Sequence, residues 1–171
     1  TRDFDVEQLW RDNRLNPIHE GTSGIQAADF VGRKLIRDKG EALALFMARV
    51  RRTCAAAGDH VELAPLAASL EGWAGRFDAV AQSLFGGGPG DPLANAHAML
   101  SAFGDLAVAW MLLDQASVLA ASGGRPGMTE ARIAACRYFF AAELPAIGHR
   151  LTLAEQRCDA ASSLSPEIFA S

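Results

Sequence analysis

Hydrophobic residues recur every three or four positions along four long segments of the chain, which is the spacing of an amphipathic helix. The segments span about residues 39–57, 65–85, 93–122 and 129–158. The repeat in the second segment consists of Leu66, Leu70, Trp73, Phe77, Val80 and Leu84. Glycine-containing breaks separate the segments, and Thr129 is expected to cap the fourth.

Pro145 lies inside the fourth segment, where a proline removes a backbone hydrogen bond and is expected to kink or split the helix. No segment has the alternating pattern of a convincing strand. Four amphipathic helices joined by short loops predict an all-α protein built around an antiparallel four-helix bundle.

The first forty residues have a different pattern. Residues 3–14 predict a short amphipathic helix, residues 15–22 an irregular segment, and residues 23–37 another helix. Ser23 and Gln26 fit a capping box at the start of that helix, because each side chain satisfies a backbone N–H of the other residue. Gly40 is a natural break. We therefore expect two parts, residues 1–40 and residues 41–171.

Composition and charge narrow the possible functions. The formal net charge is −4 at pH 7 and half of the residues are hydrophobic, which argues against a disordered chain and a nucleic-acid-binding domain. A local basic cluster consists of Arg33, Lys34, Arg37, Lys39, Arg49, Arg51 and Arg52. A solvated helix face that also holds acidic residues explains this cluster better than a docking surface for an anionic partner.

The three cysteines, Cys54, Cys136 and Cys158, form no CxxC pair, which argues against a disulfide framework and a zinc site. Each falls on an apolar helix face, so we expect buried, reduced thiols. Reduced thiols and the absence of a recognisable signal peptide favour a cytoplasmic location.

Neither a membrane span nor a metal site is predicted. The apolar stretch 98–121 contains Asp105 and Asp114, whose charges argue against a membrane-spanning helix. The histidines downstream of residue 40 have no ligand spacing.

The most specific pattern is the run RDNRLNPIHEGTSGIQAADFVGRKL at residues 11–35. Arg11, Asp12 and Arg14 are followed by Glu20-Gly21-Thr22 and then by Ile25-Gln26. This ordered run resembles the active-site signature of the acyl-CoA dehydrogenase family. Asp29 and residues 32–35 resemble the branch of that family that has an extra helical domain after the dehydrogenase core.

The resemblance implies a domain organisation and a reaction. Residues 1–40 would be the end of the dehydrogenase helical domain with its active-site loop, and residues 41–171 the four-helix extension. The implied reaction desaturates an acyl-CoA thioester by removing an α-proton and transferring a hydride from the β-carbon to FAD. The implied partners are an electron-transfer flavoprotein or a similar acceptor and further copies of the chain in a homo-oligomer.

The resemblance also assigns roles to residues. Glu20 is the implied catalytic base, and a partly buried carboxylate has the raised pKa that this role needs. Gly21 is the implied substrate-binding residue, since it lets the backbone approach the thioester. Thr22, Ser23 and Gly24 are the implied FAD contacts, at a helix N-terminus whose N–H groups suit polar cofactor atoms.

Taken singly, these residues have simpler explanations. Glu20 alone fits a surface carboxylate beside a helix N-terminus, and Thr22 and Ser23 are ordinary cap residues. Only the complete run favours the catalytic interpretation. His19 stands where the family usually has an aromatic residue, which leaves the acyl preference and the tuning of Glu20 open.

Two alternatives to a dehydrogenase remain. Residues 40–171 could form a helical interaction or oligomerisation module without catalysis that packs against another subunit or a membrane surface. The chain could also be a free-standing helical bundle whose signature is a coincidence. Since no stretch predicts the β-rich domain that holds the flavin in the family, we expect the chain alone to be inactive and to bind FAD poorly.

Overall fold

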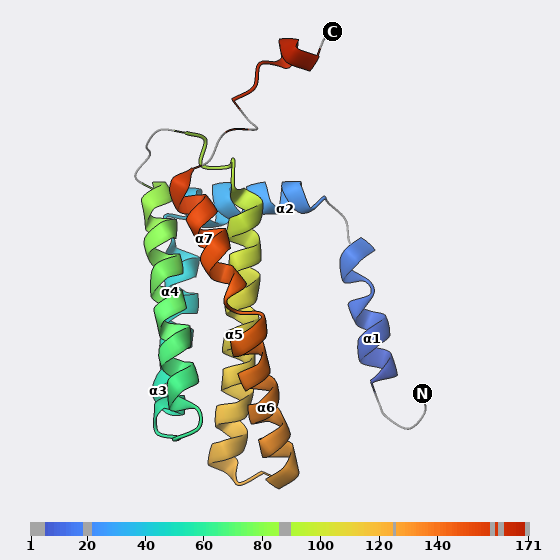
Figure 1. Cartoon of the computed structure of the whole chain (residues 1–171), viewed down its shortest axis with the longest axis vertical. Coiled ribbons are helices and arrows are strands. Elements are labelled where there is room, and N and C mark those ends of the chain that lie inside the picture. The colour runs from blue at the N-terminus through green and yellow to red at the C-terminus, as the bar shows by residue number, and fades with distance from the viewer. Residues whose placement is uncertain are drawn as a thin grey trace.

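The protein is all-α in a computed structural model that describes residues 6–18, 22–85, 90–124, 126–157, 160 and 163–169. These residues form seven α-helices and three short 3-10 or π segments, and no strand is found among them. Figure 1 shows long rods packed side by side, with the N-terminal helix standing apart from them. The predicted fold class is confirmed.

Four rods form the bundle. They are α3 (Glu41–Gly58), α4 (Ala64–Phe85), α5 (Ala96–Ser122), and α6 (Pro126–Ala142) continued by α7 (Ala146–Gln156). Consecutive rods run in opposite directions (Figure 1). Each rod contacts the next, α4 also contacts α7, and α3 also contacts α5, so the four rods enclose one core. The prediction of an antiparallel four-helix bundle is therefore confirmed.

Two prolines set the ends of helices in the fourth rod. Pro145 is the N-cap residue of α7 and divides the rod, as its position in the sequence predicted. The rod begins at Pro126, so the predicted cap at Thr129 is wrong. A proline suits the first turn of a helix because its fixed φ matches the helix and its missing N–H has no partner there. Pro126 therefore starts α6 three residues earlier.

The apolar faces of the rods meet in one core. Its side chains with 0% exposure include Leu70, Phe77, Leu106, Leu113, Leu144, Ile147 and Leu151. Leu70 and Phe77 belong to the hydrophobic repeat that predicted the buried face of the second segment. Full burial of such a side chain stabilises the folded state by roughly 1.5–3 kcal/mol, so this core is the main source of stability.

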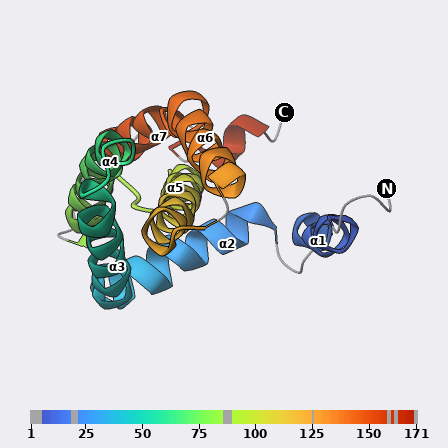
Figure 2. The ribbon, with the colours of Figure 1, turned by 90° about the horizontal axis from the view of Figure 1, so that it is seen from below.

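A continuous helical rod crosses one end of the bundle and is formed by α2 (Ser23–Asp29) and the π-helix η2 (Phe30–Arg37). Figure 2 shows α2 beside α5. Ala27, Val31 and Leu35 are buried in the bundle core. The helix predicted over residues 23–37 is confirmed, whereas its π geometry was not predicted. Ile25, in the first turn of α2, is 64% exposed.

The N-terminal helix α1 (Glu7–Asn13) has no buried residue and lies away from the bundle in both views (Figures 1 and 2). It ends one residue earlier than predicted, and the first residues of the predicted helix lie outside the described part. The 3-10 turn η1 (Asn16–Ile18) falls in the segment that was expected to be irregular. The predicted domain boundary after residue 40 stays a prediction.

By length and composition alone, α5 is the one helix in the described part that could cross a membrane. A core helix of a soluble bundle meets the same criterion, and α5 contacts α3, α4, α6 and α7. Its two acidic residues face bundle partners, since Asp105 forms an ion pair with Arg150 and Asp114 accepts a hydrogen bond from Thr53. Since only 33% of its apolar window is buried, the prediction that α5 is not a membrane span stays a prediction.

Gly40 joins η2 to α3 in a conformation that only glycine adopts at low cost. Its φ is +76°, and a Cβ built on it would lie 2.9 Å from Cε2 of Phe85. We expect Gly40→Ala to lower the free energy of unfolding by about 2 kcal/mol, because an alanine is strained at this φ and must displace the ring. Denaturant unfolding followed by circular dichroism measures the change.

Gly58→Ala is the matched control for Gly40→Ala. A Cβ on Gly58, the last residue of α3, meets no atom within 4 Å, and its φ is not positive. We expect that variant to be unchanged or more stable by about 0.5 kcal/mol. Equal stability of the two alanine variants would show that Gly40 is not constrained.

Cys54 and Cys136 are buried free thiols, as predicted, while Cys158 lies outside the described residues. Burial raises the pKa of each thiol to about 11, and the nearby Glu71 adds to the shift at Cys54. Reaction with thiol reagents requires the thiolate. The fold therefore protects both side chains at neutral pH.

In a Cys158→Ser background, we expect both buried thiols to react about a hundredfold more slowly at pH 8 than a free cysteine. The thiolate fraction falls tenfold per pKa unit, and both pKa values rise from 9.0 to about 11. The rate should keep rising with pH to about 11 in the folded protein. A stopped-flow assay with a disulfide reagent tests this, and a plateau near pH 9 would contradict it.

Candidate functional site

The residues of the predicted site lie at and before the N-terminus of α2. His19, Glu20 and Gly21 are outside the described residues, so their predicted roles stay predictions. Thr22 is the N-cap of α2, with extended backbone (φ −71°, ψ 152°), and its Oγ1 accepts a hydrogen bond from the Ile25 N–H at 3.4 Å. The cap is therefore Thr22 rather than the predicted Ser23. Both hydroxyl side chains suit the role, and the extended backbone at Thr22 decides it.

The start of α2 is open to an incoming group. Thr22, Ser23 and Gly24 are exposed, and a Cβ on Gly24 would meet no atom within 4 Å. Thr22 and Ser23 offer hydroxyl groups, and the first turn of α2 adds backbone N–H donors. These donors and the free space fit a polar cofactor atom at this position.

Aromatic side chains fix the rod that carries these residues. The Phe30 ring of η2 lies 4.9 Å from the Phe103 ring of α5, measured between centroids. Phe103 also contacts Phe46 of α3 at 4.9 Å and Phe77 of α4 at 5.9 Å. Phe103 therefore contacts η2, α3 and α4. It joins the continuous rod of α2 and η2 (residues 23–37), which we call the site rod, to the bundle.

The first part of the signature is held by contacts within α1. Arg11 pairs with Glu7, and Gln8 donates to Asp12 at 3.0 Å. The Arg14 guanidinium lies 5.4 Å from the centroid of the Trp10 ring. The ion pair within α1 thus joins Arg11 to Glu7, while Asp12 accepts from Gln8.

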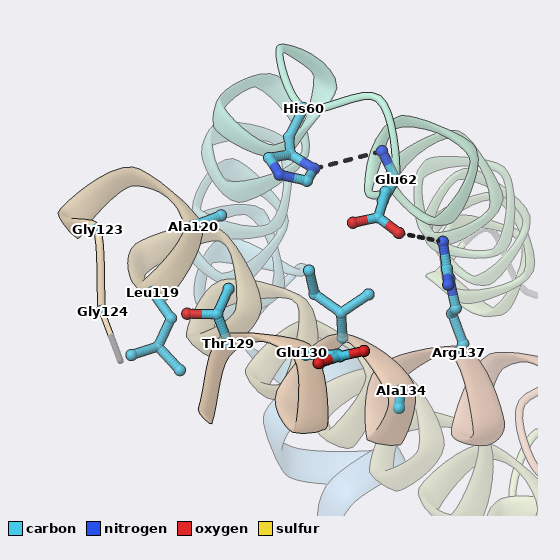
Figure 3. A pocket seen from close by; sticks show the side chains of 11 residues that line it. His60, Glu62, Leu119, Ala120, Gly123, Gly124, Thr129, Glu130, Ala134 and Arg137 are labelled. Atoms are coloured by element: carbon cyan, nitrogen blue, oxygen red, sulfur yellow. Dashed lines mark hydrogen bonds and ion pairs between the residues drawn. The ribbon is translucent and has the colours of Figure 1, made fainter. Parts of the chain in front are cut away.

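A hollow of about 560 Å³ lies at the opposite end of the bundle (Figure 3). Glu62 and Arg137 form an ion pair at 2.8 Å across its wall. The His60 Nδ1 atom accepts a hydrogen bond from the Glu62 N–H at 3.3 Å. No sequence pattern indicated this hollow, because its residues come from the loop after α3, from α5 and α6, and from the turn between these two helices.

A polar chain links α3 to α5 within the bundle. The Trp110 Nε1–H donates to Thr53 Oγ1 at 2.9 Å, and the Thr53 hydroxyl donates to Asp114 Oδ1 at 2.7 Å. Thr53 is the buried member, 5% exposed. Satisfied polar groups of this kind fix how two helices align.

Two ion pairs tie α7 to the rest of the bundle. Arg150 pairs with Asp105 of α5, and the pairing atoms are buried. Arg76 of α4 holds Glu155 with two hydrogen bonds, at 3.0 and 2.9 Å. Hydrogen bonding to Arg76 lowers the pKa of Glu155. Since this second pair is exposed, its contribution to stability is below about 1 kcal/mol.

No group of three or more His, Cys, Asp or Glu residues suited to a metal ion occurs within the described ranges. The described part of the candidate site thus consists of hydroxyl groups and backbone donors at the start of α2.

Comparison with known proteins identifies relatives among the acyl-CoA dehydrogenases. Over 164 residues the chain is 29% identical to the broad-specificity linear acyl-CoA dehydrogenase FadE5 of Mycobacterium tuberculosis, covering 84% of this chain and 26% of that protein. Over 48 residues it is 46% identical to the 3-methylmercaptopropionyl-CoA dehydrogenase of Ruegeria pomeroyi, covering 28% of this chain and 8% of that protein. The chain therefore spans about a quarter of the first relative and less than a tenth of the second.

The family match covers most of the bundle. Residues 46–165 match the family described as acetyl-CoA dehydrogenase C-terminal like, and this range begins within α3 and extends beyond α7. It agrees with the four-helix extension that the resemblance of Asp29 and residues 32–35 implied. The match, together with the similarity to two acyl-CoA dehydrogenases, shows that the chain belongs to the acetyl-CoA dehydrogenase C-terminal-like family.

Proposed function

We propose that the chain is the C-terminal part of a flavin-dependent acyl-CoA dehydrogenase that desaturates acyl-CoA thioesters between the α and β carbons. The observation that carries the proposal is the joint presence of two features. Residues 11–35 contain the ordered active-site signature, and residues 46–165 match the C-terminal family. Since both relatives are acyl-CoA dehydrogenases, the two features support one parent enzyme.

In this proposal Glu20 takes the proton from the α-carbon. Its carboxylate accepts the proton as the α C–H bond breaks, while the β-carbon loses a hydride. Bound FAD supplies the two-electron acceptor for that hydride. Gly21 keeps side-chain atoms away from the thioester, which lets the backbone lie close to the substrate. Partial burial of Glu20 would raise its pKa towards the operating pH and strengthen it as a base.

Thr22, Ser23 and Gly24 are the residues that would hold FAD. This assignment is supported by the exposed start of α2. Thr22 is the N-cap there, Ser23 adds a second hydroxyl group, and a Cβ built on Gly24 would meet no atom within 4 Å. An electron-transfer flavoprotein or similar acceptor would then reoxidise the enzyme. We further propose a cytoplasmic homo-oligomer, on the basis of the family resemblance and the buried free thiols.

The experiment that tests this function uses the full-length polypeptide. It should be assayed against straight-chain, branched and sulfur-containing acyl-CoA esters with an artificial electron acceptor. Turnover of at least one ester with formation of the enoyl-CoA supports the proposal. A flavin-loaded full-length protein that turns over no ester would favour the alternative, a helical interaction or oligomerisation module.

A further inference from the structure

A basic hollow of about 400 Å³ lies where η2 ends and α3 begins. Arg33, Lys34 and Arg37 line it, together with Asp38 and Ala42. The three cationic side chains are exposed. They belong to the basic cluster that the sequence pattern assigned to an ordinary solvated helix face, but the fold gathers them around one concavity.

The charges around this hollow are only partly neutralised. Arg33 pairs with Asp29, whose Oδ1 lies 2.6 Å from the arginine Nε. The Asp38 carboxylate binds the first turn of α3, where its Oδ2 accepts a hydrogen bond from the Ala42 N–H at 2.8 Å. Lys34 and Arg37 have no ion pair or hydrogen bond within the described part of the chain. The hollow therefore presents two cations without an ion-pair partner, beside one carboxylate, and its lining keeps a net positive charge.

The hollow lies at the C-terminal end of η2, which is a π-helix. π-helical segments are rare and are found frequently at functional sites.

We propose that this hollow binds a phosphate-bearing small molecule through Lys34 and Arg37, with Arg33 as a third donor. A guanidinium matches two phosphate oxygens in its plane, and an ammonium adds a compact positive charge. The volume falls within the roughly 300–1,000 Å³ that is usual for small-molecule sites. The site involves none of residues 20–24, so it does not depend on the proposed dehydrogenase chemistry.

The test is a titration of the purified 171-residue chain with inorganic pyrophosphate, ADP and coenzyme A at low ionic strength, followed by calorimetry. We expect saturable pyrophosphate binding that weakens as salt is added. The double variant Lys34→Gln/Arg37→Gln should bind at least about tenfold more weakly, because it loses two charge-assisted contacts. Arg52→Gln removes an exposed cation of the same basic cluster that does not line the hollow, and it should change affinity less than about twofold.

The ligand series also identifies the source of the phosphate. Equal affinity for all three ligands would show that the hollow recognises the phosphate groups alone, whereas tighter binding of ADP or coenzyme A would show that a nucleotide is preferred. Both results support the site. Absence of saturable pyrophosphate binding, or equal binding by the double variant and Arg52→Gln, would overturn it. Because no flavin or acyl substrate is present, the result is independent of whether the parent enzyme is a dehydrogenase.

Discussion

Replacing Glu20 with glutamine in the full-length enzyme is expected to lower kcat for acyl-CoA esters by about a thousandfold, within the range of a lost general base. Glutamine keeps the size and shape of the side chain but cannot accept the α-proton. The KM should change little, because the interaction that is lost matters in the transition state more than in the bound substrate. Reduction of the flavin in a single turnover, followed by absorbance, measures the step directly.

The pH profile separates a base from a merely structural residue. The wild-type kcat should fall on the acidic side as Glu20 becomes protonated, and the variant should lose that limb. Glu130→Gln is a suitable control, because it makes the same change at the hollow at the far end of the bundle (Figure 3). Unchanged single-turnover reduction in Glu20→Gln would remove Glu20 from the mechanism. The family membership of the bundle would be unaffected by that result.

The sequence was sufficient to predict the bundle, because burial of one helix face imposes a repeat that the chain carries along its whole length. Pro145 and the glycine-containing breaks then indicated where one helix ends and the next begins along the chain. Pairings between rods were not predictable in the same way. Thr53 bonds to Trp110 and Asp114, which are 57 and 61 residues away, and the hydrophobic repeat alone does not specify contacts over such separations.

The sequence pattern also failed to predict local details where two residues or two helix types were about equally favourable. Thr22 and Ser23 both make good caps, and the backbone conformation at Thr22 decided between them. Over the eight residues of η2, the hydrophobic spacing does not distinguish a π-helix from an α-helix. For the site itself, the sequence predicted a helix that begins with Ser23 as its cap, one residue after the cap that the structure has, and the roles of Thr22, Ser23 and Gly24 stay predictions. The positions of Glu20 and Gly21 lie outside the described residues and stay predictions.

Phe103→Ala is expected to lower the free energy of unfolding by about 3 kcal/mol, the usual cost of truncating a well-packed phenylalanine. The ring contacts Phe30, Phe46 and Phe77, so its loss opens a cavity between the site rod, α3 and α4. Val108→Ala on the same helix is the control, since Val108 is 46% exposed and should cost less than about 1 kcal/mol. Denaturant unfolding gives both values.

The same substitution tests whether the bundle holds the proposed flavin contacts in place. If Phe103 docks the site rod, hydrogen exchange in Phe103→Ala should speed up more at residues 23–37 than in α4, because Phe30 loses its partner on α5. A double-mutant cycle with Phe30→Ala should give a coupling of about 0.5–1.5 kcal/mol, the range for aromatic pairs. Uniform acceleration of exchange and no coupling would mean that Phe103 serves the core alone. Coupling together with selective exchange would instead make the C-terminal bundle the support that positions Thr22, Ser23 and Gly24 for the cofactor.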